Sequence, residues 1–420
     1  MDPDRGYPDA LASDPLHLGW MQGSPPPPDK TIRHEDGSFL RFPQTRWSYS
    51  HMRQFGPTVA VPRGSAPVAV LPRDERGDLD TLPIVLGDAR LVNWLESLAL
   101  NYTDGIVVLH RGTIVYERYF GAGAQHRPHI AFSVTKSFVG TLAALLAHEQ
   151  LLDTRAPVTH YVPELARSAY GDATVRQVMD MTVGVDCSED YQDPKAGIWE
   201  LLRAAGILPP VPGGAGPRTL CDYLVGVPKR GAHGEAFAYH TVNTEVLGWI
   251  LRRVSGRPFA QLLSERIWQK LGAEHDAYML IDRAGTELCG SGLAATLRDL
   301  ARFGEALRLW GYFNGQQILP AAVVEDIRRG ADAAHFARAR IYSTSLPGAS
   351  YRNMWWVTHN AHGAFSARGV HGQTIWIDPA AEMVVARFAS HHLAANVDID
   401  PTSLPCYEAL ARHLVRQGGT

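Results

Sequence analysis

Strand-like segments occur at both ends of the regular part of this chain, and a long, mostly helical stretch separates them. Near the start, residues 105–110 and 113–119 are rich in β-branched and aromatic side chains on either side of an Arg-Gly turn, which predicts a β-hairpin. Three later segments have the same strand-like composition: 354–357, 374–377 and 383–388. Strands at both ends of a helical middle indicate an α/β (α+β) fold that is interrupted by a helical insertion.

This pattern divides the 420 residues into three parts. Residues 1–85 are rich in Pro, Gly and Arg, and we expect an irregular N-terminal arm that packs its scattered aromatic side chains on the main body. Residues 86–157 and 291–420 are predicted to form the α/β domain, and residues 158–290 the mainly helical domain. A chain of this length fits one large two-part fold or two domains.

Composition and charge argue against several classes of function. The formal net charge of -3 gives no electrostatic case for binding nucleic acid. The four cysteines are far apart and lack zinc-ligand spacing, so we expect reduced thiols, no metal and no cofactor. The sequence shows neither a membrane-spanning apolar stretch nor a secretory signal, which predicts a cytoplasmic protein. Its expected partner is a small molecule, and a homodimer is left open.

The apolar helix predicted from residue 133 to about 150 begins with Ser133-Val134-Thr135-Lys136. Positions i and i+3 share a face of a helix, so the Ser133 hydroxyl would lie beside the Lys136 amine. A desolvated lysine can accept the hydroxyl proton near neutral pH, and the start of a helix stabilises an oxyanion. The same spacing also suits a surface lysine one turn after a helix-capping serine, so the motif does not decide the matter alone.

Two later segments fit the same chemistry. Tyr239 stands just before a helix predicted over 247–254, and a phenol whose pKa is lowered by a neighbouring lysine could act as a base and then as an acid. Packing in the core is the ordinary alternative for a single tyrosine. The run Gly369-Val370-His371-Gly372 leads into the strand at 374–377, and such a strand edge can bring main-chain N–H groups to a substrate carbonyl.

The order of these three elements resembles that of class C β-lactamases, DD-peptidases and related esterases. Over residues 90–400 the chain more closely resembles the 6-aminohexanoate-dimer hydrolases, the nylon-oligomer enzymes of this penicillin-recognising superfamily. The resemblance rests on five blocks: 132–137, 157–165, 189–194, 243–249 and 370–373. It implies a β-lactamase/transpeptidase-like antiparallel sheet flanked by helices, with an inserted helical domain. It also implies a serine hydrolase that cleaves small esters or linear amides through an acyl-enzyme.

Carried over position by position, the resemblance implies that Ser133 is the acylated nucleophile and that Lys136 and Tyr239 activate it. The backbone N–H groups of Ser133 and Val370 would form the oxyanion hole. Tyr191 would contact the substrate and its leaving amine from a mobile loop.

A second loop, at residues 195–216, would shape the substrate pocket. His371 is also a candidate substrate-binding residue, although a supporting histidine beside the oxyanion strand explains it equally well.

Two departures from the family pattern bear on the substrate. Ala367-Arg368-Gly369 stands where β-lactamases and DD-peptidases usually carry Lys-Thr-Gly, so the cation that meets a penicillin carboxylate is missing from its usual place. Leu202 is aligned with the carboxylate that meets the substrate amine in the nylon-dimer enzymes, with Glu200 nearby but not matched. A β-lactamase or DD-peptidase-type enzyme and a catalytically silent binding protein on the same fold are the alternative interpretations.

Overall fold

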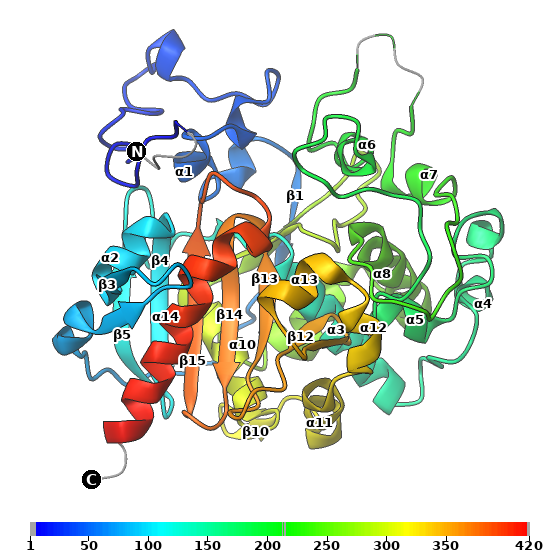
Figure 1. The fold of residues 1–420 in the computed structure, drawn as a ribbon. Helices are drawn as coiled ribbons and strands as arrows, with labels where there is room; N and C mark the ends of the chain where they lie inside the picture. Colours follow the sequence, from blue (N-terminus) through cyan, green and yellow to red (C-terminus); the bar gives the residue numbers. More distant parts are fainter. Residues whose placement is uncertain (1–5, 212, 214–215, 418–420) are drawn as a thin grey trace.

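The computed structural model describes residues 6–417 except 212, 214 and 215, and its centre is a seven-stranded antiparallel sheet (Figure 1). The strand order is β11-β12-β13-β14-β15-β4-β5. The strands are β4 (Thr103–His110), β5 (Thr113–Tyr119), β11 (Ser350–Arg352), β12 (Trp355–Val357), β13 (Phe365–Gly369), β14 (Gln373–Asp378) and β15 (Met383–Ala389). The predicted hairpin is β4–β5, and β15 joins it to the C-terminal strands through an antiparallel pairing with β4. The two distant parts of the sequence therefore complete one sheet.

Helices cover both faces of this sheet, and the alternation along β4 shows why. Val107 and Leu109 point into the core shared with α3 (Val134–His148) and α10 (Leu297–Arg308), while Ile106 and Val108 point into a second core. The second core is closed by α2 (Trp94–Leu100) and by α14 (Asn396–Gln417), which crosses the front of the sheet in Figure 1. Successive strand side chains face opposite sides, so a sheet buried on both faces needs apolar residues at nearly every position.

A second, four-stranded antiparallel sheet lies beside the helical region, in the order β1-β7-β8-β6. Its strands are short: β1 (Thr58–Val61), β6 (His129–Ile130), β7 (Ala277–Leu280) and β8 (Leu293–Ala295). The sequence pattern did not predict this sheet, and β1 places a regular element inside the arm that was expected to be irregular. A further small hairpin pairs β2 (Pro83–Val85) with β3 (Leu91–Asn93).

Between β6 and β8 the regular elements are helices, apart from the strand β7, in the part that the structure describes. The helices between α3 and β7 are α4 (Val158–Tyr161), α5 (Val175–Met179), α6 (Gly197–Ala204), α7 (Leu220–Leu224), α8 (Thr241–Ser255) and α9 (Phe259–Leu263). The remaining helices are α1 (Thr45–Ser48) in the arm, and α11 (Ala321–Arg329), α12 (Ala333–Ala337) and α13 (Arg340–Ser345) before the C-terminal strands. The long, buried α8 packs against α3, which sets the nucleophile helix against the helical region.

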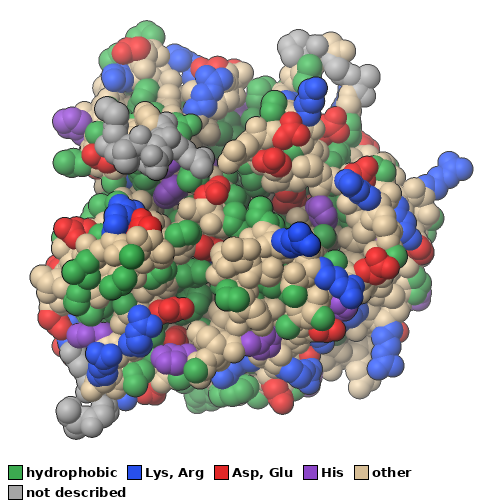
Figure 2. All heavy atoms as spheres, in the orientation of Figure 1, with side chains coloured by type: hydrophobic (Ala, Val, Ile, Leu, Met, Phe, Trp, Pro, Cys, Tyr) green, Lys and Arg blue, Asp and Glu red, His purple; other side chains and the backbone are tan. Residues whose placement is uncertain are grey.

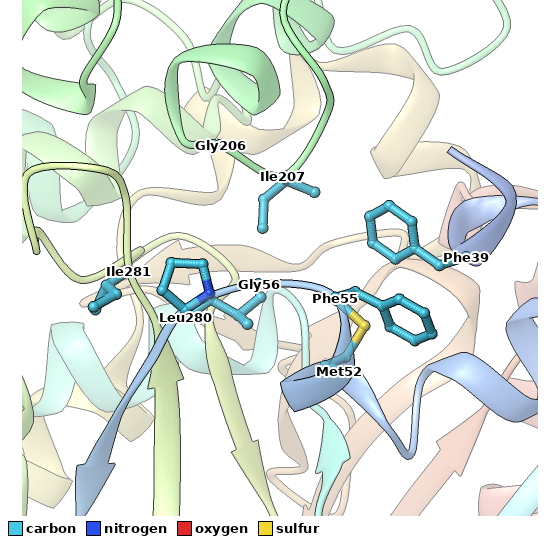
Figure 3. Close-up of a pocket in the computed structure, with 9 residues that line it drawn as sticks. Phe39, Met52, Phe55, Gly56, Gly206, Ile207, Leu280 and Ile281 are labelled. Atoms are coloured by element: carbon cyan, nitrogen blue, oxygen red, sulfur yellow. The ribbon is translucent and has the colours of Figure 1, made fainter. Parts of the chain in front are cut away.

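The N-terminal arm packs its aromatic side chains against the loop that follows α6. Phe39 and Phe55 face Ile207 across an apolar cavity of about 10 Å³, which is no larger than one water molecule (Figure 3). The imidazole Nε2 of His34 lies 3.2 Å from the carbonyl oxygen of Gly206, which adds a polar contact to the same seam. The arm therefore packs as part of the surface around the loop that follows α6.

The surface in Figure 2 shows basic and acidic side chains interspersed over this face of the molecule, without a single-sign field. Among the described residues, no helix is both long and apolar enough to cross a membrane.

Candidate active site

A sharp turn delivers Ser133 to the start of α3. Ala131 still donates its N–H to the carbonyl of Leu293 in β8, at 2.8 Å, and Phe132 then adopts a left-handed conformation with φ +44°. A bulky residue in this region is strained by about 1–3 kcal/mol, so the surrounding packing must hold the turn. Ser133 immediately precedes Val134, the first residue of α3, and is only 6% exposed. The turn thus places a shielded hydroxyl at a helix N-terminus.

Lys136 lies one turn further along α3 and is completely buried. Its Nζ donates to the Ser133 Oγ at 2.9 Å, to the Thr241 Oγ1 at 3.0 Å and to the Gly290 carbonyl at 2.7 Å. Burial lowers the pKa of Lys136 to about 8, although the negative charges of Glu189 and Glu245 act in the opposite direction. The amine can therefore lose its proton near neutral pH while it is hydrogen-bonded to the serine, as a general base must.

Tyr239 reaches the same point from the residue before the N-cap of α8. The Nζ of Lys136 lies 5.2 Å from the centre of its ring, and the phenol shares a side-chain hydrogen bond with Ser133. The Tyr239 ring also stacks on Trp356, with 5.4 Å between the ring centroids. The three residues predicted as the catalytic set are brought together.

The pKa of Tyr239 differs from the sequence-based expectation. Burial raises this pKa well above its ordinary value, and the hydrogen bond with Ser133 and the charge of Arg368 oppose that change only in part. The phenol is therefore protonated near neutral pH, ready to donate a proton rather than to accept one. The lysine did not lower the pKa as expected, because burial has the larger effect.

The edge of β13 meets the nucleophile turn closely. A Cβ added at Gly369, the last residue of β13, would lie 2.7 Å from the Ala131 carbonyl oxygen and 3.0 Å from the Ser133 nitrogen. Only glycine allows this approach without displacement. Val370 begins a short 3₁₀ helix and Ser133 precedes α3, and N–H groups at such positions have no intrahelical acceptor. The strand edge that leads into Val370 thus lies directly against the backbone of Ser133, the other residue predicted to contribute an N–H group to the oxyanion hole.

His371 follows directly, with φ +62°, and its ring contacts the nucleophile turn. Its Nδ1 lies 2.7 Å from the carbonyl oxygen of His391, so this nitrogen carries the proton and Nε2 is left as an acceptor. Burial lowers the pKa of His371 to about 4, which keeps the imidazole neutral. The ring centroid lies 5.8 Å from that of Phe132 and 5.4 Å from that of Tyr49, so His371 supports the turn.

Tyr191 lies on the segment before α6. Its ring packs edge-on against Trp199 of α6 with centroids 6.0 Å apart. Burial is the main cause that raises its pKa, and Glu189, Tyr239, Tyr342 and Tyr49 add to the effect, which places its phenol in the same neighbourhood as Tyr239.

Leu202 stands three residues after Trp199 on α6 and shares a face with it, half-buried against the core, whereas Glu200 is exposed to solvent. The predicted pocket loop at 195–216 thus contains α6. Residues 212, 214 and 215 of this loop lie outside the described residues.

Arg368, the cation nearest to the missing Lys-Thr-Gly position, is already engaged. Its guanidinium forms an ion pair with Asp400 of α14 and lies 5.4 Å from the ring centre of Trp356, and the side chain is only 6% exposed. Its charge still reaches Tyr239, where it favours the ionised phenol. The guanidinium therefore acts inside the protein instead of presenting a free cation to a substrate carboxylate.

Sequence reasoning missed four polar groups of this site: Thr241, Gly290, Glu189 and Glu245. Thr241 stands two residues after Tyr239 and Glu189 two residues before Tyr191, so both lie close to recognised positions. Gly290 and Glu245 give no local signal, because a carbonyl group and a buried helix residue acquire their roles only through the fold.

Comparison with known proteins shows the family of this chain. The family model described as Beta-lactamase matches residues 102–400. The chain belongs to the beta-lactamase family.

Relatives within the beta-lactamase family narrow the resemblance. The chain is 33% identical over 388 residues to the 6-aminohexanoate-dimer hydrolase of Paenarthrobacter ureafaciens, covering 91% of this chain and 90% of that protein. A solved structure from Bacillus anthracis, described as a candidate 6-aminohexanoate-dimer hydrolase, superposes with a TM-score of 0.83 at 34% identity, covering 93% and 99% of the two chains. A family VIII carboxylesterase shares the fold, with a TM-score of 0.52 at 17% identity, over 75% and 96% of the chains. The chain is accordingly a serine hydrolase with the β-lactamase fold.

Proposed function

We propose that this protein hydrolyses small esters and linear amides through a covalent acyl-enzyme on Ser133. The observation that carries the proposal is the 2.9 Å hydrogen bond between Ser133 and a completely buried Lys136 whose pKa lies at about 8. A neutral Lys136 accepts the Ser133 proton while Oγ attacks the substrate carbonyl carbon. The backbone N–H groups of Ser133 and Val370 stabilise the resulting oxyanion.

Tyr239 supplies the proton for the leaving group. Its buried phenol stays protonated near neutral pH, so it can donate to the departing alkoxide or amine nitrogen as the tetrahedral intermediate collapses. Water then attacks the carbonyl carbon of the acyl group and gives its proton to the Tyr239 phenolate. The Lys136 ammonium returns a proton to the Ser133 Oγ as the carboxylic acid is released. In this scheme Tyr191, near Tyr239, steadies the leaving group, and His371 acts by supporting the oxyanion turn.

We further propose that neutral esters are better substrates than the 6-aminohexanoate dimer. The dimer carries an ammonium group, and burying a cation without a partner is costly. Leu202 offers an apolar side chain on the face of α6 that carries Trp199, and Glu200 points to solvent. Esters also demand less of the acid step, because an alkoxide leaves more easily than an amine anion.

A β-lactam substrate is less favoured, because Arg368 is committed to Asp400. The proposed setting is the cytoplasm, and it is supported by four free cysteines: Cys187, Cys221, Cys289 and Cys406. The partner proposed from the site is the small substrate itself, and a homodimer stays a sequence-based expectation.

The test is turnover of p-nitrophenyl acetate and of a linear amide by the wild type and by Ser133→Ala. Wild-type hydrolysis with essentially complete loss in a folded Ser133→Ala variant supports the proposal. A Ser133→Ala variant that keeps a tenth of the wild-type kcat overturns it.

A further inference from the structure

A continuous chain of hydrogen bonds leads from the nucleophile to a carboxylate that the proposed mechanism does not use. Lys136 Nζ lies 2.9 Å from Ser133 Oγ and 3.0 Å from Thr241 Oγ1, and the Thr241 hydroxyl donates to Glu189 Oε2 at 3.1 Å. The other oxygen of Glu189 accepts the backbone N–H of Thr241. Glu189 therefore holds Thr241 at two points, and Thr241 holds the lysine.

The position of the Glu189 carboxylate at the start of a helix favours its negative charge. Thr241 is the first residue of α8, a 15-residue helix, so Glu189 accepts one of the free N–H groups at its N-terminus. A negative charge there is stabilised by the helix dipole. Glu189 comes from a different segment of the chain, so the contact ties that segment to α8.

The segment in question is the one that carries Tyr191, two residues further on. The residues that follow, 192–195, are exposed, and their hydrogen bonds are local: Gln192 donates to Asp190 at 2.9 Å and Lys195 to Asp193 at 2.9 Å. Glu189 is half-buried and bonded to the catalytic framework. It thus marks the point where the Tyr191 segment is attached to the site.

We propose that Glu189 is a positioning residue that, through Thr241, holds the Lys136 amine against Ser133 and at the same time fixes the segment that carries Tyr191. This inference rests on the proposed function, because it assigns a partner to the proposed base. It couples the two halves of the reaction: the group that activates the serine and the group that steadies the leaving amine share one anchor.

The electrostatic surroundings of Lys136 make the role of Glu189 measurable. The polar groups that face the amine are Ser133 on its own helix, Thr241 and Glu245 on α8, the Gly290 carbonyl before β8, Glu189, and the ring of Tyr239. Glu245 accepts the N–H groups of Cys289 at 2.9 Å and Gly290 at 2.8 Å, and burial raises its pKa to about 7. The negative charge of Glu189 raises the pKa of the lysine more than that of Glu245 does.

The test is the pH dependence of kcat/KM for p-nitrophenyl acetate in Glu189→Gln. The amide oxygen of glutamine can still accept one of the two Thr241 hydrogen bonds, so the substitution removes the charge and one acceptor. Without that charge burial acts more fully, the pKa of Lys136 falls, and the acid limb of the profile moves to lower pH. The two groups are at most about 6 Å apart, so Coulomb's law between aqueous and protein-like dielectric predicts a shift of about 0.5 to 2 pH units.

Asp190→Asn is the matched control, because it removes one negative charge from the neighbouring exposed residue and can keep its bond to Gln192. Its acid limb should coincide with that of the wild type. Glu189→Asp, which keeps the charge, should return the limb of Glu189→Gln toward the wild-type position. An unshifted limb in folded Glu189→Gln, or an equal shift in Asp190→Asn, overturns the inference.

If the Glu189→Gln protein folds poorly, a second variant, Thr241→Val, tests the same inference. Thr241→Val removes the hydroxyl link and keeps the backbone N–H. It should lower kcat on a linear amide more than kcat on the ester, because the lysine loses one hydrogen bond and the Tyr191 segment keeps only one of its two attachments to Thr241. Equal losses on the two substrates contradict the coupling. Labelling of wild-type Ser133 with a fluorophosphonate distinguishes a failure of the proposed function from a failure of the role proposed for Glu189. A wild type that is not labelled refutes the proposed function. A wild type that is labelled, together with variants whose pH profiles do not shift, refutes only the role of Glu189.

Discussion

Replacing Gly369 by alanine should damage the oxyanion hole, because the added methyl group pushes the strand edge away from the nucleophile turn. The added Cβ would lie 2.7 Å from the Ala131 carbonyl oxygen and 3.0 Å from the Ser133 nitrogen, and both of these neighbours are backbone atoms. Gly369 has φ -129°, so alanine meets no conformational penalty and the effect is purely steric. Because ordinary contacts begin at about 3.4 Å, the strand edge and the nucleophile turn must move apart by several tenths of an ångström.

This displacement weakens one or both N–H donors to the oxyanion. Loss of one such donor costs about 10²–10³ in kcat, or about 2.7–4 kcal/mol, so we expect Gly369→Ala to lower kcat by about tenfold to several hundredfold, depending on how far the donors retreat. KM for a small ester should change little, because the donors act mainly on the transition state.

The assay is steady-state hydrolysis of p-nitrophenyl acetate beside thermal unfolding. Gly77→Ala is the control, because a Cβ there meets no atom within 4 Å and φ is not left-handed. A folded Gly369→Ala enzyme with wild-type kcat would refute the assignment of this strand edge to the oxyanion hole.

Three further predictions concern the proton transfers and the substrate. The kcat/KM of the wild type should rise with pH to a plateau with a midpoint near 8, because Lys136 must be neutral to accept the serine proton and its pKa is about 8; a profile that is flat from pH 6 to 9 would exclude the lysine as the base. Tyr239→Phe should lower kcat on a linear amide by about 10²-fold or more, and on an activated ester by less, since only the amide needs the proton; equal kcat for both forms on the amide contradicts this role. Leu202→Asp should raise kcat/KM on the 6-aminohexanoate dimer by about tenfold and leave a neutral ester nearly unchanged; an unchanged ester-to-dimer ratio means that another carboxylate, such as Glu200, meets the amine.

The features of this molecule that depend on the local spacing of residues could be predicted from the sequence. The hairpin β4–β5, the helix α3 and the strands β14 and β15 follow from apolar patterns and turn residues, and all are found within a few residues of their predicted bounds. The contact between Ser133 and Lys136 also depends only on helical spacing, so it could be expected from four residues of sequence.

Features that depend on how distant segments pack together could not be predicted from the sequence pattern. The strands β6 and β8 contain two and three residues, too few to show alternation, yet they set the turn before Ser133. The direction of the pKa change at Tyr239 was wrong at the sequence level, because burial outweighs the neighbouring charges and burial becomes known only from the fold. The buried Glu245 likewise reaches the site only because α8 packs against α3.

The central claim is that Ser133 forms a covalent acyl-enzyme, and peptide mass spectrometry of the labelled protein tests it most directly. The wild type, mixed with a fluorophosphonate and then digested, should carry one adduct on the peptide that contains Ser133, and Lys136→Ala should react far more slowly. An adduct on any other residue, or a wild type that stays unmodified while it still hydrolyses p-nitrophenyl acetate, would contradict the account.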